Sequence, residues 1–435
     1  MKAFLVIVAL TSFVFCAPTC SRQRPSSGIN SAASNATATS QTQSKLVTGW
    51  YGGWYGSRAS DKFTASQIPW EKYSYVTYGF AVPSEDVQQN LELPDGEAAF
   101  NDFVEQARAK NVKTMISVGG WSGSRFFSSS VATADSRTAF AKALLNFTTV
   151  HNMSGIDFDW EFPNKQGMGC NVISDNDTTN FLELLRIVRQ QAPEGFKLTA
   201  AVGITPWNGP DGNPLTDVSE FAEVLDHIEI MGYDVYGATF SKVAGPNAPL
   251  DDSCAPTDQQ TGSVTSALKQ WTAAGFSSNQ IMLGVASYGH GFRVPNSSIG
   301  NDSQKLAQFP SLSEDQTILG TAEAPGDYGQ LDICGNTTGP GGVFEYGDMV
   351  KRGIIDSKGN GVDGLLFQYD ECSQTAYVYN STSEILINYD STKSFVAKGE
   401  FIRENDLAGL AMWNVGSDTS DNSLLDAITS SMNAE

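Results

Sequence analysis

Basic residues are scarce in this 435-residue chain. It has 27 Lys and Arg against 48 Asp and Glu, which gives a formal net charge of −21 and a pI near 4.5. Nucleic acids and anionic lipids are bound by clustered Lys and Arg, so the charge balance argues against both as partners. Charged residues make up only 17% of the chain and hydrophobic residues 40%, which excludes a chain that is disordered throughout.

Histidine and cysteine are also rare. The three His residues lie far apart in the sequence and no Cys-x-x-Cys pair occurs, which argues against a structural zinc site. One G-x-G-x-x-G match, Gly359 to Gly364, lies outside any βαβ unit and precedes no helix, so we interpret it as a hairpin turn. We therefore expect neither a metal nor a cofactor.

Long apolar runs are absent beyond the N-terminus. Residues 1–17 contain one Lys, an apolar run and then small residues, which is typical of a secretory signal peptide; a buried N-terminal helix is the alternative. Residues 18–44 are rich in Ser, Thr, Ala, Asn and Gln and too poor in large apolar side chains to form a core, so we expect a flexible linker. The sequence thus predicts a secreted, extracellular protein.

Export favours disulfides and N-glycans. Cys16 would leave with the signal peptide and Cys20 lies in the linker, so four cysteines remain for two disulfides: Cys170, Cys254, Cys334 and Cys372. Three pairings are possible, and we favour the sequential ones, Cys170 with Cys254 and Cys334 with Cys372. We expect about half of the N-glycosylation sequons to carry glycan. The sequons begin at Asn35, Asn146, Asn152, Asn176, Asn296, Asn301, Asn336 and Asn380.

Short apolar segments alternate with helical patterns along the chain. The strand candidates are Leu46–Tyr51, Tyr75–Ala81, Lys113–Val118, Gly155–Asp159, Lys197–Val202, His227–Met231, Ile281–Ala286 and Leu407–Trp413. The helix candidates are Ala98–Ala109, Ser136–Val150, Thr178–Gln191, Val218–Leu225, Ser263–Ala274, Thr392–Asn405 and Ser423–Met432. Strand followed by helix, repeated in this way, predicts an α/β fold of the (β/α)8 TIM-barrel type.

This alternation is interrupted once. Residues 289–389 separate strand seven from helix seven and contain short β-like runs such as Gly364–Tyr369 and Ile385–Tyr389. A structureless loop of that length is improbable in a compact chain, so we expect an α+β insertion subdomain, mostly antiparallel β. The barrel would then comprise residues 45–288 and 390–435.

The fourth expected strand alternates acidic with apolar side chains. Because alternate residues of a strand share a face, Asp157, Asp159 and Glu161 point one way and their apolar neighbours the other. In a barrel the apolar face packs on the helices, so the acids point inward toward the C-terminal mouth. Burying like charges together is costly, which suggests a catalytic purpose; a solvated edge strand is the alternative.

Repulsion and partial burial should keep at least one of these three acids protonated near neutral pH. Glu161 lies at the end of the strand, where barrel enzymes carry their catalytic groups. A protonated carboxyl at this place is a general acid, and its commonest use is to protonate a glycosidic oxygen.

The same stretch resembles the D-x-x-D-x-D-x-E signature of glycoside hydrolase family 18, the chitinases. Asp157, Asp159 and Glu161 match its last three acids, whereas Ser154 stands at the place of the first. Other segments resemble the family's motifs in the same order: they are Ser117-Val-Gly-Gly-Trp121, Met231-Gly-Tyr233-Asp234, Tyr288-Gly-His290-Gly-Phe292 and Trp413. The long insertion resembles that of the family members with deeper clefts.

The resemblance implies a monomeric endo- or exo-chitinase that acts on chitin or chito-oligosaccharides. It implies a retaining, substrate-assisted mechanism through an oxazolinium ion. Glu161 would be the general acid/base, Asp159 would orient the substrate's acetamido group, and Asp157 would share a proton with Asp159. Tyr233 would hydrogen-bond to the acetamido oxygen, and Asp234 would contact nearby sugar groups.

Sugar rings present apolar faces, so aromatic subsites are expected, with Trp413 as the floor under the sugar at the cleavage point. The expected substrate-binding residues are Trp413, Tyr51, Phe80, Trp121, Tyr288, Met231 and Ser117, with Trp54 and Trp207 as further candidates. Trp50 stands where many relatives have a Tyr that supports the inner Asp, and an indole N–H donates but does not accept a hydrogen bond. His290 stands where a basic residue would bias the pKa of the acid.

Two other functions remain open. A catalytically silent chitinase-like lectin would use the same groove only for binding, but such proteins characteristically lose the acid that Glu161 represents. An endo-β-N-acetylglucosaminidase acting on N-glycans is a smaller relative that usually lacks the insertion.

Overall fold

The computed structural model describes residues 44–56, 63–86, 91–300, 305–321 and 329–434. The expected signal peptide and residues 18–43 of the expected linker lie outside the described residues. No helix within the described ranges is long and apolar enough to cross a membrane.

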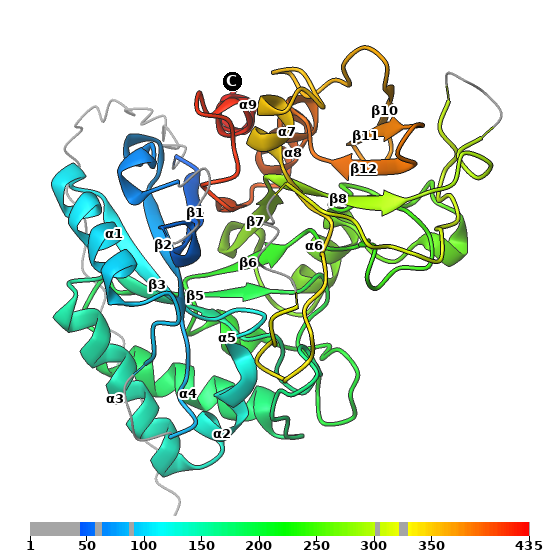
Figure 1. Cartoon of the computed structure of the whole chain (residues 1–435). Helices are drawn as coiled ribbons and strands as arrows, with labels where there is room; N and C mark the ends of the chain where they lie inside the picture. Colours follow the sequence, from blue (N-terminus) through cyan, green and yellow to red (C-terminus); the bar gives the residue numbers. More distant parts are fainter. Residues whose placement is uncertain (1–43, 57–62, 87–90, 301–304, 322–328, 435) are drawn as a thin grey trace, which may run out of the picture. The chain divides into compact units, whose positions relative to one another are not determined.

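Eight parallel strands close into a barrel, as the alternating pattern of the sequence predicted (Figure 1). Their order around the ring is β1-β13-β7-β6-β5-β4-β3-β2. The strands are β1 (Leu46–Gly52), β2 (Tyr75–Ala81), β3 (Lys113–Gly119), β4 (Gly155–Asp159), β5 (Lys197–Val202), β6 (His227–Met231), β7 (Ile281–Ala286) and β13 (Gly409–Trp413). The TIM-barrel prediction is therefore confirmed.

Helices follow most of the strands, and polar caps begin several of them. They are α1 (Glu97–Lys110), α2 (Phe127–Val131), α3 (Ala134–Val150), α4 (Asp177–Gln191), α5 (Ser219–Ala222), α6 (Val264–Ala273), α7 (Tyr346–Lys351), α8 (Thr392–Glu404) and α9 (Ser423–Met432). At the start of α3, the Thr133 hydroxyl accepts a hydrogen bond from the Ser136 N–H at 3.1 Å.

The helix expected over Val218–Leu225 is much shorter in the structure. Only Ser219–Ala222 is α-helical, because the chain turns at Asp226 to enter β6 at His227. The backbone N–H of Asp226 donates to the Leu198 carbonyl at 2.8 Å, and its carboxylate pairs with Lys197 at 2.9 Å. These contacts to β5 end the helix early.

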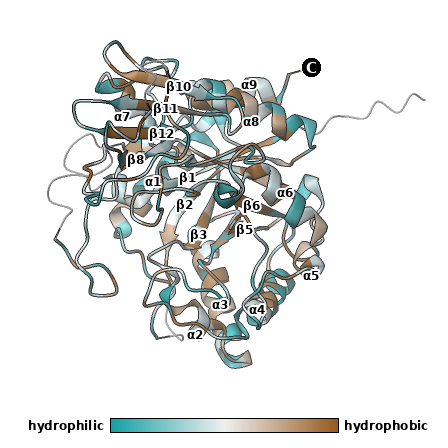
Figure 2. Ribbon diagram, turned by 90° about the vertical axis from the view of Figure 1, so that its right-hand side faces the viewer, coloured by the Kyte–Doolittle hydropathy of each residue, from teal (hydrophilic) through white to brown (hydrophobic). Residues whose placement is uncertain are grey.

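The faces of β4 divide as the alternation predicted. Ile156 and Phe158 are fully buried in the main hydrophobic core, where Phe158 packs edge to face on Phe181 of α4 with ring centroids 5.5 Å apart. Trp160 continues this layer and stacks on Phe127 of α2. Figure 2 shows hydrophobic residues, in brown, along the barrel strands and hydrophilic residues, in teal, mainly on the loops and outer helical turns. The acids of β4 are left to face the barrel interior.

A second, antiparallel sheet occupies the range expected for the insertion. Its order is β10-β11-β12-β8-β9. The strands are β8 (Tyr288–Arg293), β9 (Val343–Glu345), β10 (Leu366–Asp370), β11 (Thr375–Asn380) and β12 (Ile385–Tyr389). With α7 it forms the predicted α+β insertion between β7 and α8, the helix expected as helix seven.

The disulfide pairing differs from the one favoured on sequence. Cys170 pairs with Cys334 and Cys254 pairs with Cys372, with Cα–Cα distances of 5.4 and 6.4 Å. The sequential pairing is wrong because the insertion folds back toward the barrel, so each cysteine meets a partner more than 100 residues away rather than its sequence neighbour. Each bridge therefore ties the insertion to a barrel loop.

Candidate active site

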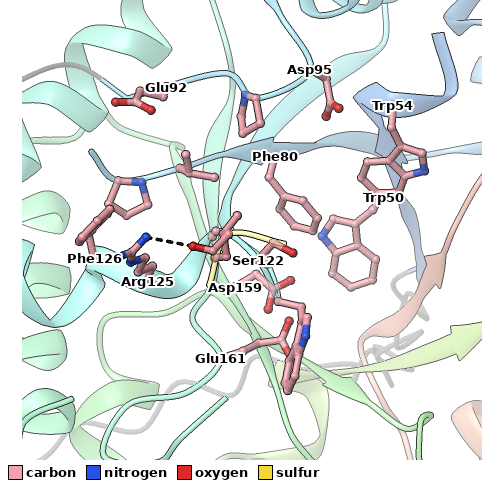
Figure 3. A pocket seen from close by; sticks show the side chains of 18 of the residues that line it. Trp50, Trp54, Phe80, Glu92, Asp95, Ser122, Arg125, Phe126, Asp159 and Glu161 are labelled. Carbon is pink, nitrogen blue, oxygen red and sulfur yellow. Dashed lines mark hydrogen bonds between the residues drawn. The ribbon is translucent and has the colours of Figure 1, made fainter. Parts of the chain in front are cut away.

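A cavity of about 1200 Å³ opens at the C-terminal ends of the barrel strands. Its lining comes from the segments that follow β1, β2, β3, β4 and β6, from the end of β13 and from Ile333 in the insertion. Figure 3 shows the carboxyl groups of Asp159 and Glu161 close together, with the rings of Trp50 and Phe80 beside them. The fold therefore places the acids of β4 where barrel enzymes carry out their chemistry.

Asp157 and Asp159 of β4 and Glu161, two residues beyond its end, form a column of increasing exposure, as the alternation predicted. Asp157 is fully buried, Asp159 is 5% exposed, and Glu161 is only partly buried at the cavity. The column therefore runs from the barrel interior to its mouth, which excludes the solvated edge strand considered as the alternative.

The loops after β3 hold the top of this column in place. Gly120 donates its N–H to the Asp159 carbonyl at 2.8 Å, and the Ser124 hydroxyl accepts from the Glu161 N–H at 2.9 Å. Gly119 has a φ of 112°, and a Cβ there would lie 2.1 Å from the Asp159 carbonyl oxygen. Only glycine fits this approach of two backbones, which explains the Gly-Gly pair of the sequence.

Asp157 is surrounded by hydrogen-bond donors. Trp50 Nε1 and Ser117 Oγ donate to its Oδ2 at 2.9 and 2.7 Å, and Thr199 Oγ1 donates to its Oδ1 at 2.9 Å. Burial raises the pKa of Asp157, while these donors and the Ala201 backbone oppose that rise. A negative charge in the column is therefore best stabilised on Asp157.

Asp159 and Glu161 favour their protonated forms. Burial raises the pKa of Asp159 well above its ordinary value, and the neighbouring charges of Glu161, Asp157 and Glu229 raise it further. Burial, followed by the charge of Asp234, raises the pKa of Glu161 from 4.5 to about 8. Asp159 Oδ1 is buried without a hydrogen-bond partner, so it is a free acceptor or donor beside the cavity. Glu161 thus has the proton that a general acid needs at neutral pH.

Glu229 on β6 is a fourth buried carboxyl that we did not expect from the sequence. It is 1% exposed, and its Oε1 accepts one long hydrogen bond of 3.4 Å from the Tyr75 hydroxyl. Burial and then the charge of Asp157 raise its pKa well above the ordinary range. Because Glu229 is neutral, the negative charge among these buried acids is carried by Asp157.

The pKa of Asp234 is lowered, in contrast to those of Asp159 and Glu161. Although burial opposes its charge, hydrogen bonding and ion pairing with His290 and a hydrogen bond from Tyr288 lower its pKa. Both the His290 Nε2 and the Tyr288 hydroxyl lie 2.7 Å from Asp234 Oδ1. The ring of Tyr233 lies beside Tyr288, with centroids 6.1 Å apart. An ionised Asp234 next to Glu161 helps to keep the proton on Glu161.

Aromatic rings surround the acids in the cavity. The ring centroids of Trp50, Trp54 and Phe80 lie 5.7 to 5.9 Å from that of Trp413. Trp121 lies at the rim with 51% of its surface exposed. Met231, Tyr233 and Asp234 also line the cavity. Trp54, one of the further candidates, therefore belongs to the site.

Several expected sugar contacts lie elsewhere. Tyr51 is wrong as a subsite, because it points out of the barrel into the core, where its ring stacks on Phe103 at 5.6 Å. Trp207 is likewise a core residue, packed on Phe221 at 4.3 Å. Ser117 is fully buried and holds Asp157 instead of lining the cavity. Tyr288 is also outside the lining and acts on Asp234.

Sequence reasoning missed three supporting groups besides Glu229. Thr199 could have been found by alternation along β5, because it shares the inward face with Ala201. Ser124 and Asn171 lie in loops, where no periodic pattern indicates direction; Asn171 Nδ2 donates to the Glu161 carbonyl at 2.9 Å. Only the folded loops show that they hold Glu161.

The barrel and its buried acids define a TIM-barrel protein with a glycosidase-like site. Residues 46–418 match the family model described as glycosyl hydrolases family 18. The chain belongs to this family, as its motifs indicated.

Known relatives support the same placement. The chain is 39% identical over 408 residues to a protein of Moniliophthora perniciosa named "chitinase-like effector", covering 93% of this chain and 90% of that one. A protein of the same name from Moniliophthora roreri is 41% identical over 371 residues, 85% and 89% of the two chains. The crystal structure of a chitinase from Rhizomucor miehei is similar with a TM-score of 0.78 and 27% identity, over 88% of this chain and 99% of that one.

Proposed function

We propose that this protein is a secreted chitinase that hydrolyses β-1,4-linked N-acetylglucosamine polymers, with Glu161 as general acid and base. The observation that carries the proposal is the pKa of Glu161, raised to about 8 by burial in a cavity walled by aromatic rings. A carboxyl that stays protonated at neutral pH beside a sugar-sized groove is suited to protonate a glycosidic oxygen.

In this mechanism the substrate supplies the nucleophile. Its acetamido carbonyl oxygen attacks the anomeric carbon while Glu161 gives its proton to the leaving oxygen, which forms an oxazolinium ion. Water then attacks the same carbon and loses a proton to Glu161, so the configuration is retained and the acid is restored.

Asp159, Asp157 and Tyr233 assist this cycle. Asp159 turns its unpartnered Oδ1 toward the acetamido N–H and balances the cation after it passes its proton to Asp157. Asp157 is ready for that exchange because its donors stabilise its charge before the proton arrives. Tyr233 hydrogen-bonds to the acetamido oxygen, and Trp413 lies under the sugar ring.

Export is part of the proposal. Residues 1–17 have the pattern of a signal peptide, and two disulfides link distant parts of the folded chain. Disulfides of this kind form and persist in oxidising, extracellular environments.

A lectin-like role is the second candidate, because two relatives are named "chitinase-like effector". In that role the cavity would bind chito-oligosaccharides without cleaving them. A hydrolysis assay on chitin hexamer, run beside Glu161→Gln, separates the two. The chitinase proposal requires turnover by the natural chain that is lost in Glu161→Gln, whereas tight binding without turnover by both supports the lectin.

A further inference from the structure

A short hairpin of the insertion, residues 329–338, lies next to the cavity; we call it the strap. Its two limbs pair through hydrogen bonds from Gly329 N–H to the Thr338 carbonyl at 3.1 Å and from Thr338 N–H to the Gln330 carbonyl at 2.8 Å. At its tip, Asp332 Oδ1 accepts the N–H groups of Cys334 and Asn336 at 2.8 Å each. These internal bonds make the strap a defined element rather than a loose loop.

Two contacts hold the tip of the strap to barrel loops, and a third joins these loops to each other. Cys334 is bonded to Cys170 in the loop after β4. Arg125, in the loop after β3, donates from Nη1 to the Ile333 carbonyl at 3.1 Å, which Figure 3 marks with a dashed line at Arg125. The Arg125 carbonyl in turn accepts the Val172 N–H at 3.0 Å. The tip of the strap is therefore fixed to the loops after β3 and β4.

The insertion leaves the barrel on the side opposite to the loops that hold the tip of the strap. The strap belongs to the insertion after β7, and its tip is held by the loops after β3 and β4. In the ring order β7-β6-β5-β4-β3, the strands β7 and β3 are four steps apart in a ring of eight, which is diametrically opposite. Figure 1 shows the yellow segment before β9 running from the insertion sheet across the front of the barrel. The chain from the insertion sheet to the tip of the strap must therefore cross the C-terminal mouth.

The crossing limits the cavity on one side. Ile333 at the tip lines the cavity together with Trp121, Arg125 and Glu161. Among the described residues, none from the segment between β5 and β6 contributes to the lining, although that segment follows a barrel strand like the others. The lining instead extends past β1 and β2 through Trp54 and Asp95.

From this arrangement we infer that the strap closes one end of the substrate groove and makes the protein specific for chain ends and short chito-oligosaccharides. A long chain enters from the β1 and β2 side and stops at the strap, so internal segments of a polymer do not lie across Glu161. This inference rests on the proposed function for the nature of the sugar, but the closed end itself depends only on the strap.

The first experiment compares two measures of cleavage on a soluble chitin derivative such as glycol chitin. New reducing ends count all cuts, whereas viscosity falls mainly through internal cuts. At an equal number of new reducing ends, the viscosity of the polymer solution should fall about fivefold less with the protein than with random cleavage by dilute acid. The reason is that only chain ends fit the groove. A viscosity loss equal to that of random cleavage would overturn the inference.

The second experiment opens the groove. Because Gln330 and Thr338 are hydrogen-bonded neighbours, residues 331–337 can be replaced by Gly-Gly, together with Cys170→Ser to avoid a free thiol. For each new reducing end, this variant should lower the viscosity of the polymer solution several-fold more than the natural chain does. The matched control is Cys254→Ser with Cys372→Ser, which removes the other disulfide and leaves the strap in place. Equal ratios in the strap variant and the natural chain contradict the inference.

A binding assay tests whether the groove is closed without depending on catalysis. In a Glu161→Gln background, hexamer binding is followed by tryptophan fluorescence, and the long polymer competes at equal mass. If the groove is closed, the long polymer should compete only weakly with the hexamer for the natural groove. In the strap variant this competition should become about tenfold stronger, because internal segments of the polymer can then enter the groove. Absence of hydrolysis by the natural chain would refute the chitinase proposal alone, whereas strong polymer competition with the strap intact would refute the closed end alone. Hexamer binding by the strap variant shows that it is folded.

Discussion

The protonation of Glu161 should control the rate at alkaline pH. With a pKa of about 8, about nine-tenths of Glu161 is protonated at pH 7, whereas a carboxyl with the ordinary value of 4.5 would be only about 0.3% protonated. Burial in the barrel mouth therefore supplies about 300-fold more of the acid form at neutral pH. We expect kcat/KM to fall along a basic limb centred near pH 8.

The assay measures kcat/KM from pH 5 to 9.5 on two substrates. An unactivated chito-oligosaccharide has a poor leaving group that needs the proton, and an aryl glycoside of the same sugar has a good one that does not. Glu161→Gln should lower the first rate by about 10²- to 10⁴-fold and the second much less. A basic limb below pH 6, or equal losses on both substrates, would contradict the role of Glu161 as a buried general acid.

Three further outcomes are expected. In His290→Ala, Asp234 loses the partner that lowers its pKa, so the acidic limb of the pH–rate profile should move to higher pH; an unchanged profile would remove this coupling. Trp413→Ala removes the ring that packs beside Phe80 and that we propose to lie under the substrate, so KM should rise about tenfold as measured by initial rates on the hexamer. Since folding raises the pKa of Glu161, the stability of the natural chain falls as pH rises from 4.5 to about 8; Glu161→Gln should therefore raise Tm by a few degrees at pH 8 and not at pH 4, as calorimetry would show.

Local pattern accounts for most of the fold. Parallel barrel strands are short, apolar and separated by helices, so both the strands and their order in the sequence can be predicted without knowledge of contacts. The failure at residues 218–225 is instructive: the helical pattern was present, but the link from Asp226 to β5 ended the helix after four residues. A tertiary contact overrode a local preference.

The aromatic candidates show how far alternation reaches. Along β4 the alternation rule gave the correct faces, and the same rule applied to β1 would have placed Trp50 inside the barrel and Tyr51 outside. The structure does so: Trp50 donates to Asp157, while Tyr51 packs in the core. For loop residues such as Trp54 and Trp207 no such rule exists, and the folded chain alone decided that the first lines the cavity and the second does not.

The sequence by itself determined the barrel, the inward column of Asp157, Asp159 and Glu161, and the family, because these depend on residue type and a period of two along one strand. Only the tertiary structure decided the disulfide partners, the buried neighbour Glu229 and the strap held across the mouth. Each of these joins segments more than 70 residues apart, and such pairings depend on how the whole ring closes rather than on any local pattern.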